Sequence, residues 1–310
     1  RLGRLEDARE ELLESWRALR EEASDQEKDG DAAGAEHYRW QAEALLDGAD
    51  SLKEQIRQAG NAAGRMELRR MEDTMLWTAQ NLMGTYHSLE AEQAAASARA
   101  EAQKHLSEKV KDQEMLGSST SYHSQEAYQK WQSALNEYER LKKEQERVRQ
   151  ELLLLTGFSP DSPVVLEKMP LPDVSRAALV NPQEDRQQAL GNNYELRSGR
   201  MGNAGSNQEL HKKQRQTELD ENQMFASLET LGDQVRSCQA EWEAACAKEQ
   251  AQRAVWQSAV RKRKLGTMAE GEYLEIYSQY MEEKGNQAQA SIRFLLAMEE
   301  YDWAKKGLMD

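Results

Sequence analysis

Several features are scarce in this 310-residue chain, and each scarcity excludes a class of protein. No apolar run approaches the ~18 residues that indicate a membrane-spanning helix, so we expect no direct membrane span. Positive charge is in deficit, because 41 Lys and Arg stand against 55 Asp and Glu and give a net charge of −14. Surfaces that bind nucleic acid are basic, so we expect no nucleic-acid partner.

Cysteines and metal-binding motifs are also few. The two cysteines, Cys238 and Cys246, lie in a stretch predicted to be helical, where eight residues span ~12 Å, too far for a disulfide within one helix. Neither belongs to a Cys-x-x-Cys pair, and no histidine belongs to a Glu-x-x-His or His-Glu-x-x-His motif. We therefore expect no catalytic residues, no metal, no cofactor and no enzyme activity.

Proline is confined to one stretch, since all five prolines lie between residues 160 and 182. Because proline breaks helix interiors, the two proline-free arms on either side are predicted to be helical. Glu, Lys, Arg, Gln and Ala, which favour helices, fill them, and no alternating strand pattern is found. The predicted helices are 2–23, 36–59, 63–115, 123–156, 183–198, 207–264 and 270–306, with turns at 24–34, 60–64, 117–121, 199–207 and 266–271.

Apolar residues recur with the spacing of coiled-coil seams. One seam has steps of three and four and runs through Leu228, Leu231, Val235, Cys238, Trp242 and Ala245, with Leu210 and Met224 upstream in phase. Other seams comprise Leu68, Met75, Leu82, Leu89 and Ala96, then Tyr128, Trp131, Leu135 and Tyr138, and finally Tyr273, Tyr280, Phe294 and Tyr301. Two predicted helices exceed 50 residues, which is too long for ordinary globular elements. The sequence therefore predicts an all-α fold of elongated antiparallel coiled-coil hairpins.

The two arms resemble each other. Gly117 and Gly157 are 40 residues apart, Gly266 and Gly307 are 41 apart, and each first glycine follows a predicted helix of more than 50 residues. The pattern Leu-Gly-Ser/Thr occurs at both first glycines. We infer two tandem repeats, 1–157 and 183–310, joined by a proline-rich link, 158–182.

Glycine explains why a helix stops at each tip, because it readily adopts the left-handed conformation. Ser118 or Thr267 can then begin the next helix, and Thr267-x-x-Glu270 has the pattern of a capping box. The basic run 261–264 precedes the second tip. It complements the negative end of the helix dipole, and partner docking is the alternative interpretation.

These features together resemble the TolC-type outer-membrane efflux proteins over about residues 60–310. KLGTMAEGEYLEIYSQY is similar to the family's second tip, and ASIRFLLAMEEYDWAKKG is similar to the end of its return helix. ELLLLTGFSPDSPVVLEKMPLPDVSRAALVNPQEDRQQAL is similar to the link between its repeats, with an Asn-Pro pair where the next helix begins.

The resemblance implies a homo-trimeric helical tunnel that passes drugs, metals or proteins outward and docks adaptor proteins of the membrane-fusion type at its glycine tips. The residues that match the tips are Leu116, Gly117, Ser118, Leu265, Gly266 and Thr267. Entrance carboxylates of the family fall on Glu272 and Glu275, and in the first repeat the equivalent positions are His123 and Glu126.

The chain departs from the family in one respect. The family places two membrane-spanning strands in each repeat between its paired long helices, and no turn here is long enough to hold them. Either these strands were removed from the chain or the protein is a relative that lacks them. A coiled-coil scaffold or interaction protein without transport activity is the alternative function.

The start of the chain bears on its location. It begins at Arg1, with no initiator methionine and no signal-peptide pattern. We expect a mature or trimmed chain whose signal peptide has been removed, located in the extracytoplasmic cell envelope, either periplasmic or at the cell surface.

Overall fold

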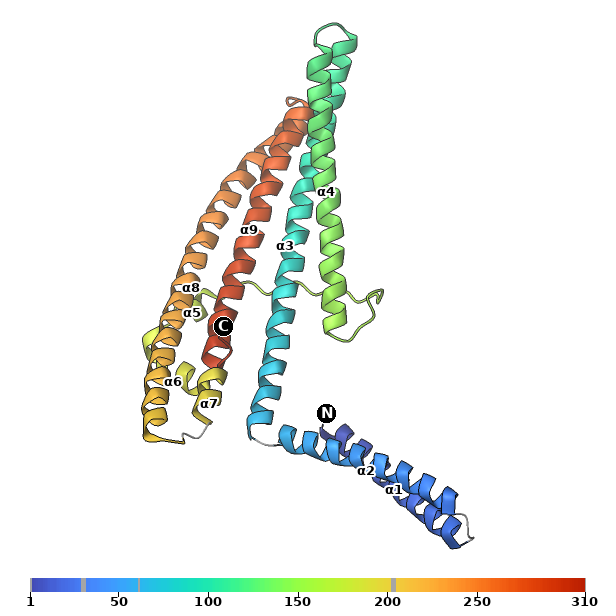
Figure 1. The fold of residues 1–310 in the computed structure, drawn as a ribbon. Coiled ribbons are helices and arrows are strands. Elements are labelled where there is room, and N and C mark those ends of the chain that lie inside the picture. Colours follow the sequence, from blue (N-terminus) through green and yellow to red (C-terminus); the bar gives the residue numbers. More distant parts are fainter. Residues whose placement is uncertain (1, 29–31, 61, 202–204, 310) are drawn as a thin grey trace. The chain divides into compact units, whose positions relative to one another are not determined.

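The computed structural model describes residues 2–28, 32–60, 62–201 and 205–309, and all regular secondary structure in them is helical (Figure 1). The helices are α1 (Leu2–Lys28), α2 (Ala32–Gly60), α3 (Ala62–Met115), α4 (Ser121–Leu155), α5 (Val174–Ala177), α6 (Pro182–Asn192), α7 (Tyr194–Met201), α8 (Asn207–Lys264) and α9 (Glu270–Lys306). The predicted all-α fold class is confirmed. None of these helices, within the described ranges, is both long and apolar enough to cross a membrane.

The chain divides into two compact units, Arg1–Asp73 and Thr74–Asp310. In the first unit, α1 and α2 pack on each other, and the ion pair between Arg39 and Glu27 joins them. The alanines buried in this unit are Ala23, Ala35, Ala42 and Ala49. Because these side chains are small, the two helices lie close together while burying little apolar surface.

The hydrophobic core of the second unit lies between α8 and α9. Leu228 and Val235 of α8 are fully buried, as are Phe294 and Tyr301 of α9. Leu231, Cys238 and Trp242 pack against this cluster, and the Trp242 ring lies 5.7 Å from that of Phe294. The seam predicted from the three-and-four spacing is therefore confirmed along this part of α8.

Helix α3 runs antiparallel to α9, and small residues set their closest approaches. A methyl group at Gly84 would lie 2.7 Å from Leu296 Cδ1, and one at Gly285 would lie 3.3 Å from the Ala91 carbonyl oxygen. Gln289 donates to the Glu92 carboxylate at 2.8 Å in the same interface. These contacts place the middle of α3 beside the middle and C-terminal half of α9.

The link between α4 and α6 is held by polar side chains. Arg149 of α4 donates to the carbonyl oxygens of Ser162 and Val164. Further along, His87 of α3 contacts the Glu167 carbonyl oxygen through Nε2 at 2.8 Å and the Glu90 carboxylate through Nδ1 at 2.9 Å. Through the contact with Glu167 the His87 ring joins α3 to the link.

Helices α5 and α6 attach the end of the link to the core. Arg176 of α5 pairs with Glu299 and Asp302 of α9. Pro182 is the first residue of α6, as the Asn-Pro pair predicts, because a proline there loses no hydrogen bond. Its ring packs on Gly232 of α8, where an added methyl would lie 2.6 Å from Pro182 Cγ.

Helix boundaries differ from prediction in a few places. Helix α1 continues to Lys28, past the predicted end at 23, and an ion pair with Asp25 stabilises this last turn. The predicted helix 183–198 is divided, because Asn193 adopts an extended conformation and its Oδ1 accepts from Leu196 N–H to begin α7. Parts of three predicted turns, residues 29–31, 61 and 202–204, lie outside the described residues.

Some predicted seam positions are wrong. Met75, Tyr128 and Leu210 are exposed in the structure. Leu210 lies in the first turn of α8, while the buried stretch of that helix begins at Met224. Leu210 thus lies beyond the packed stretch, whereas Met75 lies between half-buried Leu68 and Leu82, and Tyr128 follows buried Ala127. Spacing alone therefore does not tell which seam positions are covered.

Candidate functional site at the two hairpin tips

The first tip, Leu116–Ser118, closes the α3–α4 hairpin with a Schellman motif. Gly117 has φ +75°, in the left-handed region, and donates its N–H to the Glu114 carbonyl at 2.9 Å. Ser118 N–H donates to the Gln113 carbonyl at 2.8 Å, and its hydroxyl donates to the same oxygen at 3.0 Å. These bonds satisfy the last carbonyls of α3 and leave the Leu116 side chain 83% exposed.

The second tip, Leu265–Thr267, repeats this arrangement at the end of α8. Gly266 has φ +71° and donates to the Arg263 carbonyl at 3.0 Å. Thr267 donates to the Lys262 carbonyl through N–H at 3.0 Å and through its hydroxyl at 3.1 Å. Leu265 is 77% exposed. The two tips therefore share backbone geometry, hydroxyl position and an exposed leucine.

The opposite ends of the hairpins use the same glycine geometry with a different following residue. Gly157 and Gly307 have φ +82° and +106°, and they are followed by Phe158 and Leu308. An apolar residue at this position packs against the end of the helix, whereas the tips carry a hydroxyl there.

The next helices do not begin as predicted. The N-cap of α4 is Thr120, whose hydroxyl accepts from His123 N–H at 3.4 Å, and Ser118 does not cap it. The N-cap of α9 is Ala269, without a side-chain cap bond, so the predicted capping box at Thr267 and Glu270 is wrong. The Thr267 hydroxyl bonds back to α8 instead, which closes the tip rather than starting the next helix.

Glu270 has another role, since it pairs with Arg263 across the second tip at 2.7 Å. The Arg263 guanidinium also lies 4.1 Å from the centre of the Tyr273 ring. Below this contact, Tyr273 stacks on Tyr277, and Trp256 stacks on Tyr280 at 4.7 Å. This row of aromatic rings joins α8 to α9 up to the tip.

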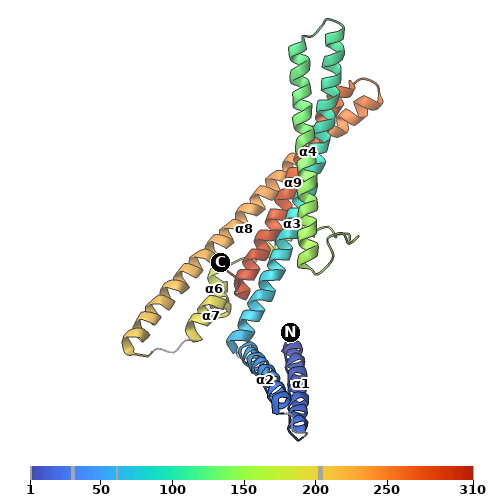
Figure 2. The ribbon, with the colours of Figure 1, turned by 45° about the vertical axis from the view of Figure 1, so that its right-hand side comes forward.

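Both tips lie at the same end of the second unit. Gly271, in the first turn of α9, lies beside His105 of α3, where an added methyl would be 3.3 Å from His105 Nδ1. Helix α3 continues ten residues past His105 to Met115, which is about 15 Å at 1.5 Å per residue. The first tip therefore projects beyond the second, as Figure 1 and Figure 2 show.

The predicted entrance carboxylates do not form one cluster. Glu126 pairs with Lys130 at 2.8 Å, and this hydrogen bond holds the pKa of Glu126 below its usual range. Glu272 and Glu275 are exposed on α9, and His123 is exposed on α4. Within the described part of the chain, no three His, Cys, Asp or Glu side chains are grouped so that they could hold a metal ion.

An apolar hollow in the second unit was not predicted from the sequence. Its volume is about 590 Å³, and it lies between α3, α4, α9 and the link. Leu76, Met83, Leu152, Phe158 and Leu295 contribute much of its lining. The run of leucines at 152–155 was the available signal, but their periodicity does not reveal which segment of the link faces them.

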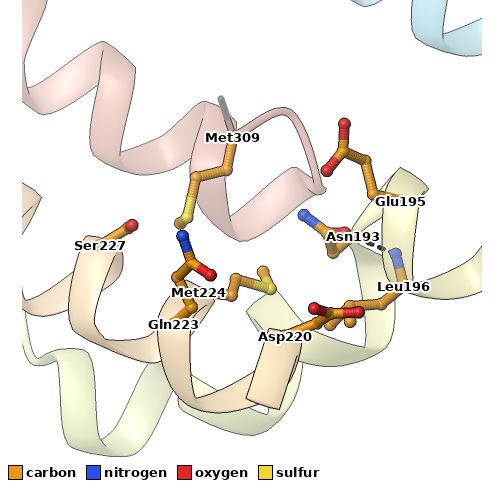
Figure 3. A pocket seen from close by; sticks show the side chains of 8 residues that line it. All are labelled: Asn193, Glu195, Leu196, Asp220, Gln223, Met224, Ser227 and Met309. Carbon is orange, nitrogen blue, oxygen red and sulfur yellow. Dashed lines mark hydrogen bonds between the residues drawn. The ribbon is translucent and has the colours of Figure 1, made fainter. Parts of the chain in front are cut away.

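A smaller hollow of about 210 Å³ lies between α7, α8 and the C-terminal residues (Figure 3). Met224 and Met309 line it together with Asp220, Gln223 and Glu195. Asn193, also in the lining, uses its Oδ1 to cap α7. The Asn193 side chain in this lining therefore already has a structural role, at the start of α7.

Comparison with known proteins gives a fold assignment. The sequence matches no known protein family and no curated protein. Among solved structures, CusC, a protein described as forming a transmembrane channel, aligns at a TM-score of 0.50 with 13% identity over 96% of this chain and 95% of that chain. The outer-membrane channel OprN aligns at 0.49, with 14% identity over 83% and 71%. The CmeC outer-membrane channel of Campylobacter jejuni aligns at 0.40, with 15% identity over 87% and 68%. The likeness to CusC shows that the two chains share a fold.

Proposed function

We propose that this chain is a TolC-like transport or export component of the cell envelope, and that its glycine tips dock an adaptor protein. One observation carries the proposal. Two hairpin tips at the same end of one unit have the same backbone geometry, and each presents a highly exposed leucine. The fold shared with CusC supports the transport role.

The exposed leucines are informative because a Schellman turn requires only the glycine. Any good helix former could occupy the position before it, and a polar one would avoid exposing an apolar side chain. Burying one leucine contributes about 1.5–3 kcal/mol. Leu116 and Leu265 thus offer a partner two apolar anchors that the fold itself leaves uncovered.

The proposal extends to location and assembly. We place the chain in the extracytoplasmic cell envelope after removal of a signal peptide, as a homo-trimer. In such an assembly Glu126, Glu272 and Glu275 would ring an entrance and attract cations. Native mass spectrometry of the purified chain tests the trimer directly, and a monomer at micromolar concentration would contradict it.

A deletion strain complemented with variants tests the tips. The double variant Leu265→Asp, Gly266→Pro should reduce export at least about tenfold while circular dichroism stays nearly unchanged, because the turn carries little of the packing. Leu219→Asp is the matched control, since Leu219 is an exposed leucine of the same helix, remote from the tip. Export that survives in the double variant would favour a coiled-coil scaffold instead.

A further inference from the structure

The two tips share one backbone geometry but carry opposite charge. The turn of α3 before the first tip contains Asp112 and Glu114 and has no basic residue. The corresponding turn of α8 consists of four consecutive cations, Arg261, Lys262, Arg263 and Lys264. This positive cluster stands out in a chain whose net charge is −14.

The helix dipole does not account for the cluster. Cations near a helix C-terminus contribute about 0.3–1 kcal/mol each, so a basic last turn can stabilise α8. However, α3 forms the same hydrogen bonds at its tip, to the carbonyls of Gln113 and Glu114, with an acidic last turn. The first tip is therefore an internal control, and it shows that the turn does not need the cations.

Only one of the four cations is used within the described chain. Arg263 pairs with Glu270 and lies over Tyr273. Arg261, Lys262 and Lys264 are exposed and form no ion pair with any described residue. Leu265 is thus an exposed apolar side chain that is flanked by three exposed cations.

The position of the second tip distinguishes between two kinds of acidic partner. The first tip projects further along the same direction, since α3 continues for about 15 Å beyond His105, which lies level with Gly271 at the start of α9 (Figure 1). A flat anionic membrane would meet the first tip before the second, and Asp112 and Glu114 would oppose that approach. A protein segment can lie beside the end of α3 and reach the second tip.

We infer that the second tip recognises an acidic protein surface through Arg261, Lys262 and Lys264, with Leu265 as the apolar anchor. The first tip, with its acidic last turn, does not share this specificity. The inference rests on the proposed function, since it names the chemistry of the partner that docks there. Charge at the rim of such a contact sets partner choice and association rate more than total affinity.

The test uses the full chain and three designed helical-hairpin peptides. They differ only in the residues that flank the loop, which are mostly Glu in the first peptide (the Glu hairpin), Gln in the second and Lys in the third (the Lys hairpin). Wild type should bind the Glu hairpin at least about tenfold more tightly than the Lys hairpin at 50 mM NaCl. The preference should fall below about threefold at 500 mM NaCl, where charges on exposed groups are screened. The variant R261E/K262E/K264E should reverse the preference.

A matched control carries the same change in net charge away from the tips. The variant K142E/K143E/K212E alters three exposed lysines of α4 and α8, and it should keep the wild-type preference. A preference unchanged in the tip variant, or absent in wild type, would overturn the inference. Tighter binding of wild type to vesicles with 30% phosphatidylserine than to the Glu hairpin, lost in the tip variant, would overturn it in favour of a membrane.

The complementation strain separates this inference from the proposed function. If R261E/K262E/K264E exports normally while Leu265→Asp, Gly266→Pro does not, the tip docks a partner but its charge does not select one. If both variants export normally, tip docking itself is wrong.

Discussion

At the scale of single residues, the cost of replacing a glycine depends on what surrounds its missing side chain. Gly266 has φ +71°, and an added methyl would meet nothing within 4 Å. Gly307 has φ +106°, and its methyl would lie 2.2 Å from the Asn192 carbonyl oxygen. We therefore expect Gly266→Ala to cost about 1–2 kcal/mol, from the left-handed conformation alone. Gly307→Ala should exceed about 3 kcal/mol, because backbone must move as well.

Urea unfolding followed by circular dichroism measures both free energies. Gly117→Ala serves as a control, since its surroundings are as open as those of Gly266. Equal costs at the tips and at Gly307 would show that the contact with Asn192 does not restrain the fold.

Tyr301 gives the second prediction at this scale. Its hydroxyl donates to Asp185 at 2.7 Å, and Lys305 pairs with the same carboxylate at 3.0 Å. Burial, followed by the hydrogen bond to Asp185, raises the pKa of Tyr301 well above its ordinary value. The protonated phenol is thus favoured in the folded state, so its contribution is complete below about pH 10, the unfolded value, and is lost as pH rises further.

We expect Tyr301→Phe to cost about 1–2 kcal/mol at pH 7, because a buried acceptor loses its donor. The difference in unfolding free energy between wild type and variant should shrink from pH 10 upward. Tyr122→Phe is the control, since Tyr122 is exposed on α4 and its phenol should not affect the profile. A difference that stays constant up to pH 11.5 would contradict this account.

At the scale of helices, the packing of α3 on α9 depends on small residues. Gly285→Leu should cost about 1–3 kcal/mol, since an added methyl would already lie 3.3 Å from the Ala91 carbonyl oxygen and the rest of a leucine would force α3 and α9 apart. Gly191→Leu is the matched control, because Gly191 is exposed and an added methyl there meets nothing within 4 Å. It should be neutral or slightly stabilising, since leucine favours helix more than glycine does. Thermal unfolding compares the two, and equal melting temperatures would show that α3 and α9 can separate at little cost.

At the scale of helices, the sequence predicts where the long helices run and where they end, but not which of them pack together. Long helices and their glycine ends follow from local physics, since a proline-free amphipathic run continues until a left-handed residue stops it. Both tips were found in this way. The pairing of α3 with α9 could not be predicted from the sequence, because Gly84 and Gly285 lie far apart in the chain and a glycine has no side chain that would indicate its partner.

The start of a helix was also hard to predict. Thr267 has the pattern of a capping box, yet its hydroxyl bonds to the Lys262 carbonyl of the preceding helix. Two local hydrogen bonds compete for one hydroxyl, and the geometry of the tip decides between them. The apolar hollow could not be predicted for a related reason, because its shape depends on the path of the link. Arg149 and His87 fix that path through contacts with backbone carbonyls of the link.

At the scale of the whole chain, the two units should differ in independent stability. The core cluster consists of residues from 169 to 309, and no described residue of the first unit belongs to it. The buried residues described in the first unit are alanines, and leucines such as Leu12 and Leu45 are only half-buried, so this unit buries little apolar surface. We expect a fragment of residues 74–310 to keep cooperative thermal unfolding, with a melting temperature within a few degrees of that of the whole chain. A fragment of residues 1–73 should melt at lower temperature and with a broader transition. Circular dichroism melts of the three chains measure this, and loss of cooperative unfolding in residues 74–310 would mean that the first 73 residues supply stability that the core does not.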